Sequence, residues 1–330
     1  MENDEADEHF GQRRLMSTET RAAPFDTTQS AEMNQAVGSD QNPSAMRANS
    51  QSTKILGDYE VIRKLGKGGF ADVYEVRRGG KAHTFSTALK VGRTTLKSDE
   101  TISRRFRRET KMLEQAKSVP GLVRMRSFGV LPEGKPYIEM DLMHGGSLAD
   151  YLKSPANVVE PTQVVDLLLA LATTIGRLCE MGIVHRDVKP ANLLSPSKEF
   201  DLADTVLADF GISADLFTTR RLTQTNQFLG TRAYAAPEQF ADSKRVDVRT
   251  DIFAGGMVMY ELLARRPFRV LGNGSIPASE ISKSAPSLSD FPDEVPRSLR
   301  YICRNCLQPI PDRRYQAVNE LVCDLKDNAF

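Results

Sequence analysis

A short polar stretch between two apolar pairs, residues 183–194, holds three side chains whose types and spacing could do chemistry together. Within it a carboxylate, an amine and an amide, Asp187, Lys189 and Asn192, follow one another at positions i, i+2 and i+5. The carboxylate could accept a proton from an attacking hydroxyl, the amine could hold a phosphate oxygen, and the amide could offer its carbonyl to a divalent cation. Any one of them alone would indicate only a solvated loop with a turn at Pro190. The apolar flanks predict that the core holds this loop at both ends.

A second carboxylate, Asp209, follows further along the chain. Residues 206–208 are apolar and predict a short buried strand that ends at this acid, and Phe210 and Gly211 come next. A carboxylate at a strand end before a glycine turn can chelate Mg²⁺ between phosphates. Asp-Phe-Gly is common by chance. Here it follows Asp187 in the sequence, after a predicted hairpin, and this order indicates that Asp187 and Asp209 belong to one site.

A glycine turn at residues 66–73 lies between two segments with alternating apolar residues, one starting at Tyr59 and one ending at Val76. The alternation predicts two strands. Glycines in such a turn let backbone amides approach phosphate oxygens, because no Cβ stands in the way. Gly-x-Gly is a weak signal by itself. A dinucleotide-binding fingerprint is disfavoured, because the next segment returns as a strand and opens no helix.

Lys90 lies in a predicted strand, Thr84–Val91, on the face opposite to its apolar neighbours. Downstream, Ser103–Leu113 has apolar residues at helical spacing and predicts an amphipathic helix. Glu109 on this helix could pair with Lys90, or it could form a surface ion pair with Lys111 or a nearby arginine. The arginines around it predict a solvated face or a docking surface for phosphate: Arg104, Arg105, Arg107 and Arg108.

Further segments must hold these groups in place. Pro136–Leu148 predicts a strand, a glycine break and a helix start. Thr162–Met181 predicts a long helix with an apolar stripe, which would lie beneath the loop at Asp187. Asp251–Leu263 predicts a nearly continuous apolar helix whose first acid could cap helix or loop amides. Residues 272–295 are rich in proline and serine and predict a long surface loop.

These motifs, all present and in this order, resemble the eukaryotic-type protein kinases over residues 59–325. Lys189, two residues after Asp187, and Gly-Thr-x-x-Tyr before Ala-Pro-Glu favour the serine/threonine class over the tyrosine class. The local sequence is similar to bacterial members. Two positions depart from the family pattern: Ala71 stands where a third glycine is usual, and Phe253 stands where a tryptophan is usual.

The resemblance implies an α+β, bilobal protein kinase fold. A kinase domain at 55–327 would comprise a small β-rich lobe with one helix (55–140), a hinge (141–146) and a larger, mainly helical lobe (147–327). A tail at 1–54 would precede it. The tail is polar and cannot bury enough apolar surface to offset its ordering entropy, so we predict that it is disordered.

The resemblance also implies the catalytic roles. Lys90 would pair with Glu109 and hold the α- and β-phosphates of ATP. Asp187 would orient and deprotonate the acceptor hydroxyl, and Lys189 would stabilise the transferring γ-phosphoryl group. Asp251 would brace the backbone of the catalytic loop.

The implied cofactors are ATP and Mg²⁺ or Mn²⁺, with Asn192 and Asp209 as the metal ligands. Met140 would be the gatekeeper, and the backbones of Asp141 and Met143 would contact adenine. The implied nucleotide-binding residues are Leu65, Gly66, Lys67, Gly68, Gly69, Phe70, Ala71, Asp72, Val73, Ala88, Lys90, Met140, Asp141, Met143 and Leu194.

An activation segment is implied at residues 209–238. Arg186 would receive a phosphate on this segment, and Arg314 would pair with Glu238 at its end. The segment's threonines are Thr218, Thr219, Thr223, Thr225 and Thr231. Our hypothesis is that Thr223 or Thr225 is the activating site.

The composition is that of an ordinary soluble globular protein, with 40% hydrophobic and 26% charged residues among 330. A formal net charge of +1 gives no reason to expect nucleic acid or an anionic membrane as the main partner. No apolar run approaches the roughly eighteen residues that span a bilayer. The acidic first residues are unlike a signal peptide. We therefore expect a cytoplasmic protein without a membrane span.

The chain has four cysteines, too few for a disulfide framework at this size. Cys303 and Cys306 form a Cys-x-x-Cys that could bind a metal. They stand among apolar residues at helical spacing, and no second Cys or His pair lies nearby. Buried helix cysteines are the favoured interpretation.

Protein substrates are the implied partners, with self-association for trans-autophosphorylation. Two other function classes stay open. A pseudokinase scaffold would bind nucleotide and partners with weak catalysis, but it normally lacks Lys90, Asp187 or Asp209, and all three are present. A small-molecule phosphotransferase with a related fold would lack the Ala-Pro-Glu at 236–238.

Overall fold

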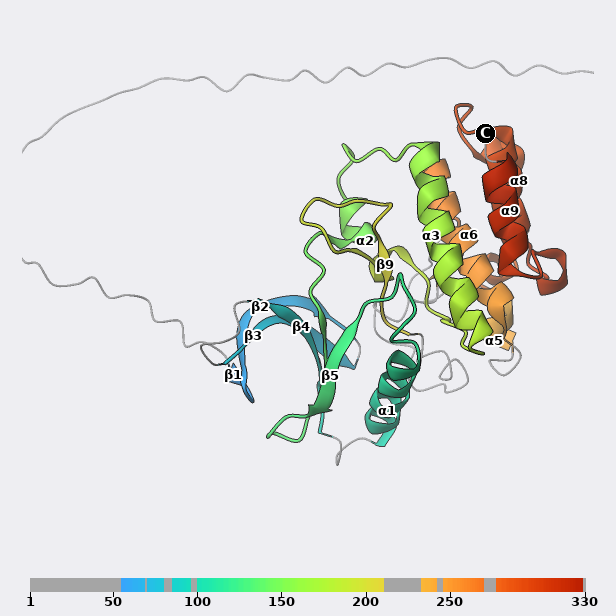
Figure 1. Cartoon of the computed structure of the whole chain (residues 1–330). Helices are drawn as coiled ribbons and strands as arrows, with labels where there is room; N and C mark the ends of the chain where they lie inside the picture. Colours follow the sequence, from blue (N-terminus) through green and yellow to red (C-terminus); the bar gives the residue numbers. More distant parts are fainter. Residues whose placement is uncertain are drawn as a thin grey trace, which may run out of the picture. The chain divides into compact units, whose positions relative to one another are not determined.

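The structure, a computed structural model, describes residues 55–68, 70–79, 85–95, 100–210, 233–241, 246–269 and 277–328. All of them belong to one compact unit, Ser50–Phe330. The predicted tail at 1–54 and Gly69 lie outside the described residues. Figure 1 shows the helices and strands of the described unit.

The N-terminal half of this unit is built on a six-stranded antiparallel sheet with the order β1-β2-β3-β4-β6-β5. Its strands are β1 (Ile55–Leu56), β2 (Tyr59–Lys67), β3 (Ala71–Arg78), β4 (Thr87–Gly92), β5 (Met125–Val130) and β6 (Pro136–Asp141). The predicted glycine turn joins β2 to β3. The strand expected from Thr84 begins at Thr87, and Thr84 itself is not among the described residues.

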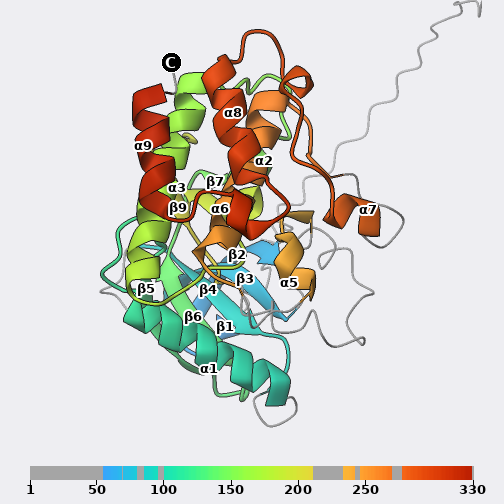
Figure 2. The same ribbon diagram turned by 90° about the vertical axis from the view of Figure 1, so that its right-hand side faces the viewer.

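Helix α1 (Glu100–Gln115) packs along the sheet at β5 and β6, as Figure 1 and Figure 2 show. Its buried Phe106 and Leu113 lie in one apolar cluster with Ile138 and Met140 of β6. Successive strand residues point to opposite faces, so Glu139 between them faces away from α1. Its buried carboxylate instead accepts hydrogen bonds from three hydroxyl groups, those of Tyr59 (3.0 Å), Thr87 (3.0 Å) and Ser127 (2.7 Å).

After β6 the chain forms β7 (Gly146–Ser147) and the short helix α2 (Leu148–Tyr151), which the Ser147 side chain caps. A second, three-stranded sheet has the order β7-β8-β9, with β8 at Leu193–Ser195 and β9 at Val206–Leu207. Leu193 pairs with Leu207 across this sheet. The sheet therefore joins the end of the predicted catalytic loop to the strand that precedes Asp209.

The C-terminal half is a helical bundle around α6 (Val248–Ala264), whose residues are almost all buried. Helices α3 (Pro161–Glu180), α8 (Arg297–Cys306) and α9 (Val318–Asn328) pack around this core (Figure 1). Helix α6 begins about one turn earlier than predicted, because the side chain of Asp247 caps it by accepting from the backbone N–H of Arg249. The predicted α+β, two-lobed fold is confirmed.

The remaining short elements are α5 (Pro237–Ala241), α7 (Ala278–Ile281) and the 3₁₀ turns Pro190–Asn192, Leu288–Asp290 and Pro311–Arg313. The long loop predicted at 272–295 is therefore wrong in part, since α7 and one 3₁₀ turn interrupt it. Residues 272–276 of that loop lie outside the described part of the chain.

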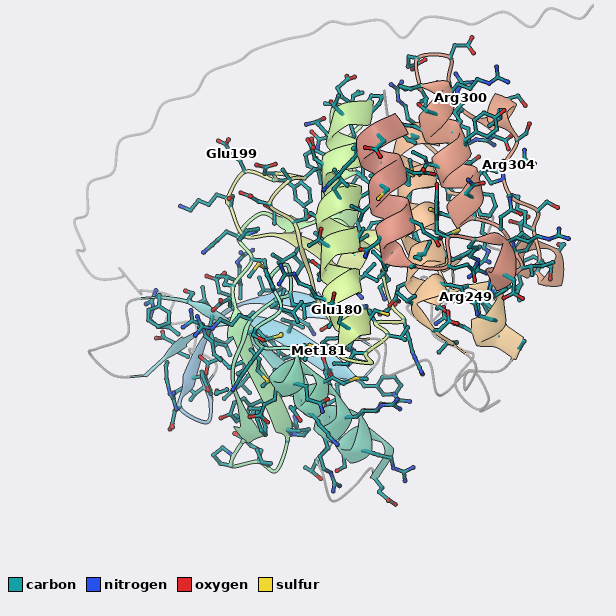
Figure 3. All side chains as sticks on the ribbon, turned by 45° about the vertical axis from the view of Figure 1, so that its right-hand side comes forward. Glu180, Met181, Glu199, Arg249, Arg300 and Arg304 are labelled. Carbon is teal, nitrogen blue, oxygen red and sulfur yellow. The ribbon has the colours of Figure 1, made fainter. Side chains whose placement is uncertain are left out.

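Helix α3 corrects one expectation about membranes. By length and apolar composition alone it could cross a bilayer, although half of the relevant window is buried. Its buried residues, from Val164 to Leu178, belong to the core that α6 and α9 share. Packing in the bundle accounts for the apolar character of α3. Figure 3 marks its last residue, Glu180, and the C-cap residue Met181 at the end of the helix nearest the sheet.

Cys303 and Cys306 are both free and fully buried on α8. Burial raises the pKa of the Cys306 thiol to about 12. The prediction that these are buried helix cysteines is confirmed.

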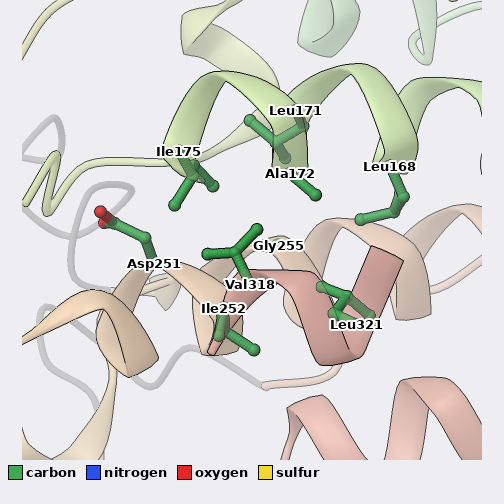
Figure 4. Close-up of a pocket in the computed structure, with 9 residues that line it drawn as sticks. All are labelled: Leu168, Leu171, Ala172, Ile175, Asp251, Ile252, Gly255, Val318 and Leu321. Atoms are coloured by element: carbon green, nitrogen blue, oxygen red, sulfur yellow. The ribbon is translucent and has the colours of Figure 1, made fainter. Parts of the chain in front are cut away.

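Two adjacent glycines of α6 offer a matched stability test. Figure 4 shows Gly255 facing α3 and α9 across a small apolar gap. A Cβ on Gly255 would lie 3.7 Å from Leu168 and Leu171, at ordinary contact distance, whereas a Cβ on Gly256 would lie 2.5 Å from the Cβ of Cys306.

We expect Gly255→Ala to raise the free energy of unfolding by about 0.5–1 kcal/mol, because alanine costs less conformational entropy in a helix interior. Gly256→Ala should lower it by about 1–3 kcal/mol through overpacking. Urea unfolding of the two variants against the wild type measures both. Shifts of the same sign would contradict the packing described here.

Candidate active site

Lys90 is the point where the sheet, α1 and the end of β9 meet. Its Nζ donates to Glu109 Oε1 at 2.5 Å and to Asp209 Oδ1 at 2.9 Å. Lys90 is held on β4 between Val73 of β3 and Ile138 of β6. Among the described residues, the structure thus pairs Glu109 with Lys90, and not with Lys111 or a nearby arginine.

The charges at this point favour the ionised forms of Lys90 and Asp209, whereas burial is the largest effect on Glu109 and raises its pKa. Burial by itself would lower the pKa of the Lys90 amine, but the charges of Asp209 and Glu109 outweigh it and the net shift is upward. Burial likewise would raise the pKa of Asp209, and the Lys90 charge outweighs that effect, so the net shift is downward. The Asp209 side chain is 39% exposed. An ionised, accessible carboxylate therefore lies beside a protonated amine.

The loop at 183–192 is held from beneath by Asp251 of α6. The backbone N–H groups of His185 and Arg186 donate to its two carboxylate oxygens, each at 2.7 Å. Arg186 has a φ of 69°, in the left-handed region that costs a non-glycine residue about 1–3 kcal/mol. The two hydrogen bonds hold this backbone in place. Burial raises the pKa of Asp251 to about 6.

Asp187 is surrounded by hydrogen-bond donors from its own loop. Lys189 Nζ lies 2.9 and 2.8 Å from its two carboxylate oxygens, and Asn192 Nδ2 donates to Oδ2 at 3.0 Å and to the Asp187 backbone carbonyl at 2.8 Å. Burial raises the pKa of the Asp187 carboxyl, while the Lys189 charge opposes the shift. The spacing i, i+2 and i+5 thus brings the three side chains together around one carboxylate.

Asn192 and Asp209 lie at one end of the small sheet. The backbone N–H of Ala208 donates to the carbonyl of Asn192 at 2.8 Å, and the next pair along is Leu193 with Leu207. An amide carbonyl and a carboxylate are oxygen donors that suit Mg²⁺, which usually takes one or two carboxylates and completes its shell with phosphate and water. Among the described residues, no cluster of three or more His, Cys, Asp or Glu could hold a metal. One amide carbonyl and one carboxylate would suit a Mg²⁺ ion whose remaining ligands come from phosphate and water.

Several implied nucleotide-binding residues come together in the apolar cluster that also contains Ile138 of β6: Phe70, Ala71, Met140, Met143 and Leu194. Ala88 stands opposite Met140 in the β4–β6 register. The backbone N–H of Asp141 donates to Arg124 O at 3.0 Å, so this N–H is not available to an adenine edge. The carboxylate of Asp141 accepts from Arg126 Nε.

The glycine turn is partly described. Gly68 N–H donates to Ala71 O at 2.7 Å, and a Cβ on Gly68 would lie 2.9 Å from that oxygen, so the turn requires glycine there. Gly66 faces open space, and Leu65 and Lys67 are exposed. The carboxylate of Asp72 pairs with Arg93 (3.0 Å) and Lys64 (3.1 Å), and its backbone lies in β3 between β2 and β4.

Arg105 corrects the expectation that all four arginines of α1 form a solvated face. Its guanidinium lies 3.6 Å from the centre of the Phe70 ring, within range of a cation–π contact. Arg104, Arg107 and Arg108 are exposed. Helix α1 is therefore tied to the glycine turn by Arg105 as well as to β4 by Glu109.

The end of the segment that precedes α5 is also anchored. Arg314 donates to both carboxylate oxygens of Glu238, at 2.7 and 2.8 Å, as the resemblance implied. The Arg314 guanidinium lies 4.7 Å from the centre of the Phe253 ring, so Phe253 fills the place of the missing tryptophan. Arg249, labelled in Figure 3, adds a hydrogen bond to Asp312 at 2.6 Å. The predicted threonines at 218–231 lie outside the described residues.

Three features were not predicted from the sequence: the hydrogen bonds of Gln239, the hydrogen bond of Tyr234 and the burial of His185. The Gln239 side chain accepts from Ala236 N–H (2.8 Å) and donates to Arg186 O (3.1 Å). The Tyr234 hydroxyl donates to Glu261. The only sequence signal for Gln239 was its position directly after the Ala-Pro-Glu.

His185 is 1% exposed and its ring lies 4.9 Å from that of Phe210. Burial lowers the pKa of this imidazole to about 3. An unfolded chain would titrate it near its usual value of about 6.5, so acid protonates the unfolded state first. Stability is therefore lost as the pH falls from about 6.5 toward 3.

We expect His185→Phe to remove this loss. Between pH 6.5 and 4.5 the wild type should lose about 2–3 kcal/mol more unfolding free energy than the variant. Urea unfolding at the two pH values measures it, with the exposed His144→Phe as the control. Equal acid sensitivity in wild type and His185→Phe would contradict the expectation.

The chain was compared with known proteins. Residues 59–324 match the family model of the protein kinase domain. The probable serine/threonine-protein kinase PknB of Lactococcus lactis is 30% identical over 277 residues, which cover 83% of this chain and 43% of that protein. PknE of Mycobacterium tuberculosis, a serine/threonine-protein kinase, is 30% identical over 274 residues, 83% of this chain and 46% of the relative.

Among solved structures, the kinase domain of Mycobacterium tuberculosis PknI is similar with a TM-score of 0.62 and 25% identity. The match covers 84% of this chain and 98% of that one. The chain spans less than half the length of the curated relatives that it matches.

Proposed function

Because this chain belongs to the protein kinase domain family, we propose that it transfers the γ-phosphoryl group of ATP to serine or threonine hydroxyls of proteins. The observation that carries the proposal is the placement of Lys90 between Glu109 and Asp209, combined with the Lys189 and Asn192 contacts around Asp187. These groups come from four separate segments. They are the groups that positioning and charge stabilisation of a phosphoryl transfer require.

The proposed cofactors are ATP and Mg²⁺ or Mn²⁺. When bound, the metal would neutralise charge on the phosphates, and Asn192 and Asp209 would hold it. Lys90, kept protonated by its two carboxylate neighbours, would hold the α- and β-phosphates. The glycine turn and the cluster around Met140 would take the rest of the nucleotide.

The residues that would act on the acceptor hydroxyl lie in the catalytic loop, residues 183–192. Asp187, with its pKa raised by burial, would orient the acceptor hydroxyl and take its proton. Lys189, which already lies against the same carboxylate, would steady the charge on the γ-phosphoryl group. The serine/threonine class is proposed from the names of the relatives and from the place of Lys189 two residues after Asp187.

The two other function classes are less favoured. A pseudokinase scaffold would bind nucleotide without efficient transfer, but Lys90, Asp187 and Asp209 are all present and the first and last are in contact. A small-molecule phosphotransferase would have no use for the buried anchor between Glu238 and Arg314, which fixes the end of the segment preceding α5.

The experiment that tests the proposal is phosphoryl transfer by the purified chain. We expect incorporation of label from γ-labelled ATP and Mg²⁺ into a degenerate peptide library with a central serine or threonine, and none into a library with a central tyrosine. Phosphate transfer only to small hydroxyl compounds would favour the phosphotransferase. ATP binding without any transfer would favour the scaffold.

We further propose that phosphorylation of the activation segment raises activity. Burial lowers the pKa of Arg186, and the nearby charge of Arg108 lowers it further. A dianionic phosphate near these two cations would relieve their mutual repulsion and would be bound by both. Such a phosphate would connect the activation segment to the catalytic loop, because Arg186 directly precedes Asp187.

A double variant, Thr223→Ala with Thr225→Ala, is expected to lower the rate of peptide phosphorylation at least about tenfold, within the range that ordering of this segment controls. Activity assays after preincubation with ATP measure it, and Thr218→Ala with Thr219→Ala is the matched control. Undiminished activity of the first variant would rule out both residues.

If autophosphorylation occurs in trans, its initial rate per molecule should rise with protein concentration, which tests the proposed self-association.

The proposed compartment is the cytoplasm. ATP would be available there, and all four cysteines are free, as in proteins of reducing compartments. Cell fractionation with an antibody to the native protein tests this proposal.

A further inference from the structure

Arg269 is a buried arginine that contacts backbone carbonyls in place of a carboxylate. It follows the end of α6 and is 2% exposed. Its Nη1 donates to the carbonyls of Ala235 (2.5 Å) and Ala233 (3.2 Å), and its Nη2 donates to the carbonyl of Ile281 on α7 (3.2 Å). Within the described part of the chain, Arg269 has no carboxylate within ion-pair distance.

The guanidinium also lies 5.2 Å from the centre of the Phe253 ring, which Arg314 approaches as well. Burial lowers the pKa of Arg269 to about 10, so it stays protonated at neutral pH. A buried cation without a carboxylate partner costs stability. The Phe253 side chain has no hydrogen-bond donor. The hydrogen bonds to the backbone carbonyls of Ala233 and Ala235 therefore come from Arg269.

The backbone that Arg269 contacts is also connected to the catalytic loop, through the side chain of Gln239. Ala235 and Ala236 are buried. The N–H of Ala236 donates to Gln239 Oε1 at 2.8 Å, and Gln239 Nε2 donates to the carbonyl of Arg186 at 3.1 Å, one residue before Asp187. Residues 233–236 are thus fixed on one side by Arg269 and connected on the other side to the loop.

We propose that Arg269 is a positioning residue for the protein acceptor: it holds residues 233–236 where the acceptor chain passes Asp187. The inference rests on the proposed kinase function. Because Asp187 is the group that would meet the acceptor hydroxyl, a segment bonded to the residue before it borders the acceptor. The groups that would hold ATP, Lys90, Asp209 and the glycine turn, lie on other elements and have no described contact with Arg269.

Two substitutions separate position from charge. Arg269→Met keeps the length and the apolar contact with Phe253 but leaves the Ala233 and Ala235 carbonyls without their donor. Arg269→Lys keeps the charge, but a single ammonium lacks the planar fork that reaches carbonyls on two segments. Arg265→Gln is the matched control, because it removes an exposed arginine that caps α6 and pairs with Glu294 at 3.3 Å.

The first readout is kinetic, with the best acceptor peptide of a degenerate serine/threonine library. We expect both Arg269 variants to raise the KM for peptide at least about tenfold, within the loss that misplaced positioning groups cause. The KM for ATP and the ATP hydrolysis rate without peptide should stay within about twofold of wild type, as should every parameter of the control. A proportional fall in peptide phosphorylation and ATP hydrolysis would overturn the proposal, and so would full rescue by Arg269→Lys.

The second readout needs no activity. Hydrogen exchange at the amides of 233–241 should quicken in Arg269→Met, while exchange in α3 and α6 stays unchanged. Unchanged exchange at 233–241 would overturn the proposal whatever the kinetics. If the wild type phosphorylates no acceptor, the proposed function fails, and the exchange result still decides whether Arg269 holds this segment.

Discussion

Replacing Asp187 with asparagine is expected to lower kcat for peptide phosphorylation by about 10²–10⁴-fold, the usual contribution of a positioned general base. The affinity for ATP should change little. Asparagine has nearly the same shape and can keep one acceptor oxygen toward Lys189 and Asn192, which now contact the carboxylate at 2.8–3.0 Å. What it cannot do is take a proton from the acceptor hydroxyl.

Steady-state kinetics for peptide and ATP, together with nucleotide binding by fluorescence, measure this outcome. Asp166→Asn on the exposed face of α3 is the matched control and should behave as wild type. Turnover of Asp187→Asn within about tenfold of wild type would contradict the assignment of the base. A parallel loss of ATP affinity would mean that Asp187 acts through nucleotide binding instead.

The second large effect is expected at Lys90. Lys90→Met should lower the free energy of unfolding by about 3–5 kcal/mol, because it removes one partner of a buried ion pair and leaves the other charge without its counter-ion. The side chains of Lys90 and Glu109 are 14% and 8% exposed, so water cannot replace the lost contact easily. Asp209 would add repulsion, since its carboxylate lies against the same amine. Peptide phosphorylation should fall with the loss of the group that would hold the phosphates.

A double-mutant cycle separates the two consequences. Adding Glu109→Gln to Lys90→Met should recover part of the stability and none of the activity, because the uncompensated carboxylate is gone while the amine is still missing. Lys111→Met, an exposed lysine of the same helix, is the control. If Lys90→Met unfolds at the same urea concentration as wild type, the ion pair does not stabilise the packing of α1 on the sheet.

Sequence patterns predicted those features of the site and the fold that depend on residues close together in the sequence. The order of Asp187, Lys189 and Asn192 places three side chains around one carboxylate, because a tight loop with a 3₁₀ turn at 190–192 folds back on itself. Alternation in β2 and β3 and the helical period of α1 likewise came directly from residue spacing, since backbone periodicity is local. The predicted two-lobed fold follows from these elements in their order.

The start of α6 shows the limit of such patterns. The apolar run begins at Asp251, yet the helix begins at Val248, because the cap is the polar Asp247 that an apolar pattern does not register. The partial burial of Arg105 was missed for a similar reason, since only the fold brings Phe70 within its reach.

By itself, then, the sequence determined which residue types are available for phosphoryl transfer, the local elements that carry them, and the family that the chain belongs to. The resemblance implied the pair of Lys90 with Glu109 and the support of the loop backbone by Asp251, and the structure has both. Tertiary structure alone decided that Asp209 also meets Lys90, and that Arg269 and Gln239 hold residues 233–236 beside that loop. The physical reason is range. A buried polar group must find its partner in whatever segment the packed core brings next to it. Because these partners lie dozens of residues away in the sequence, residue spacing cannot predict them.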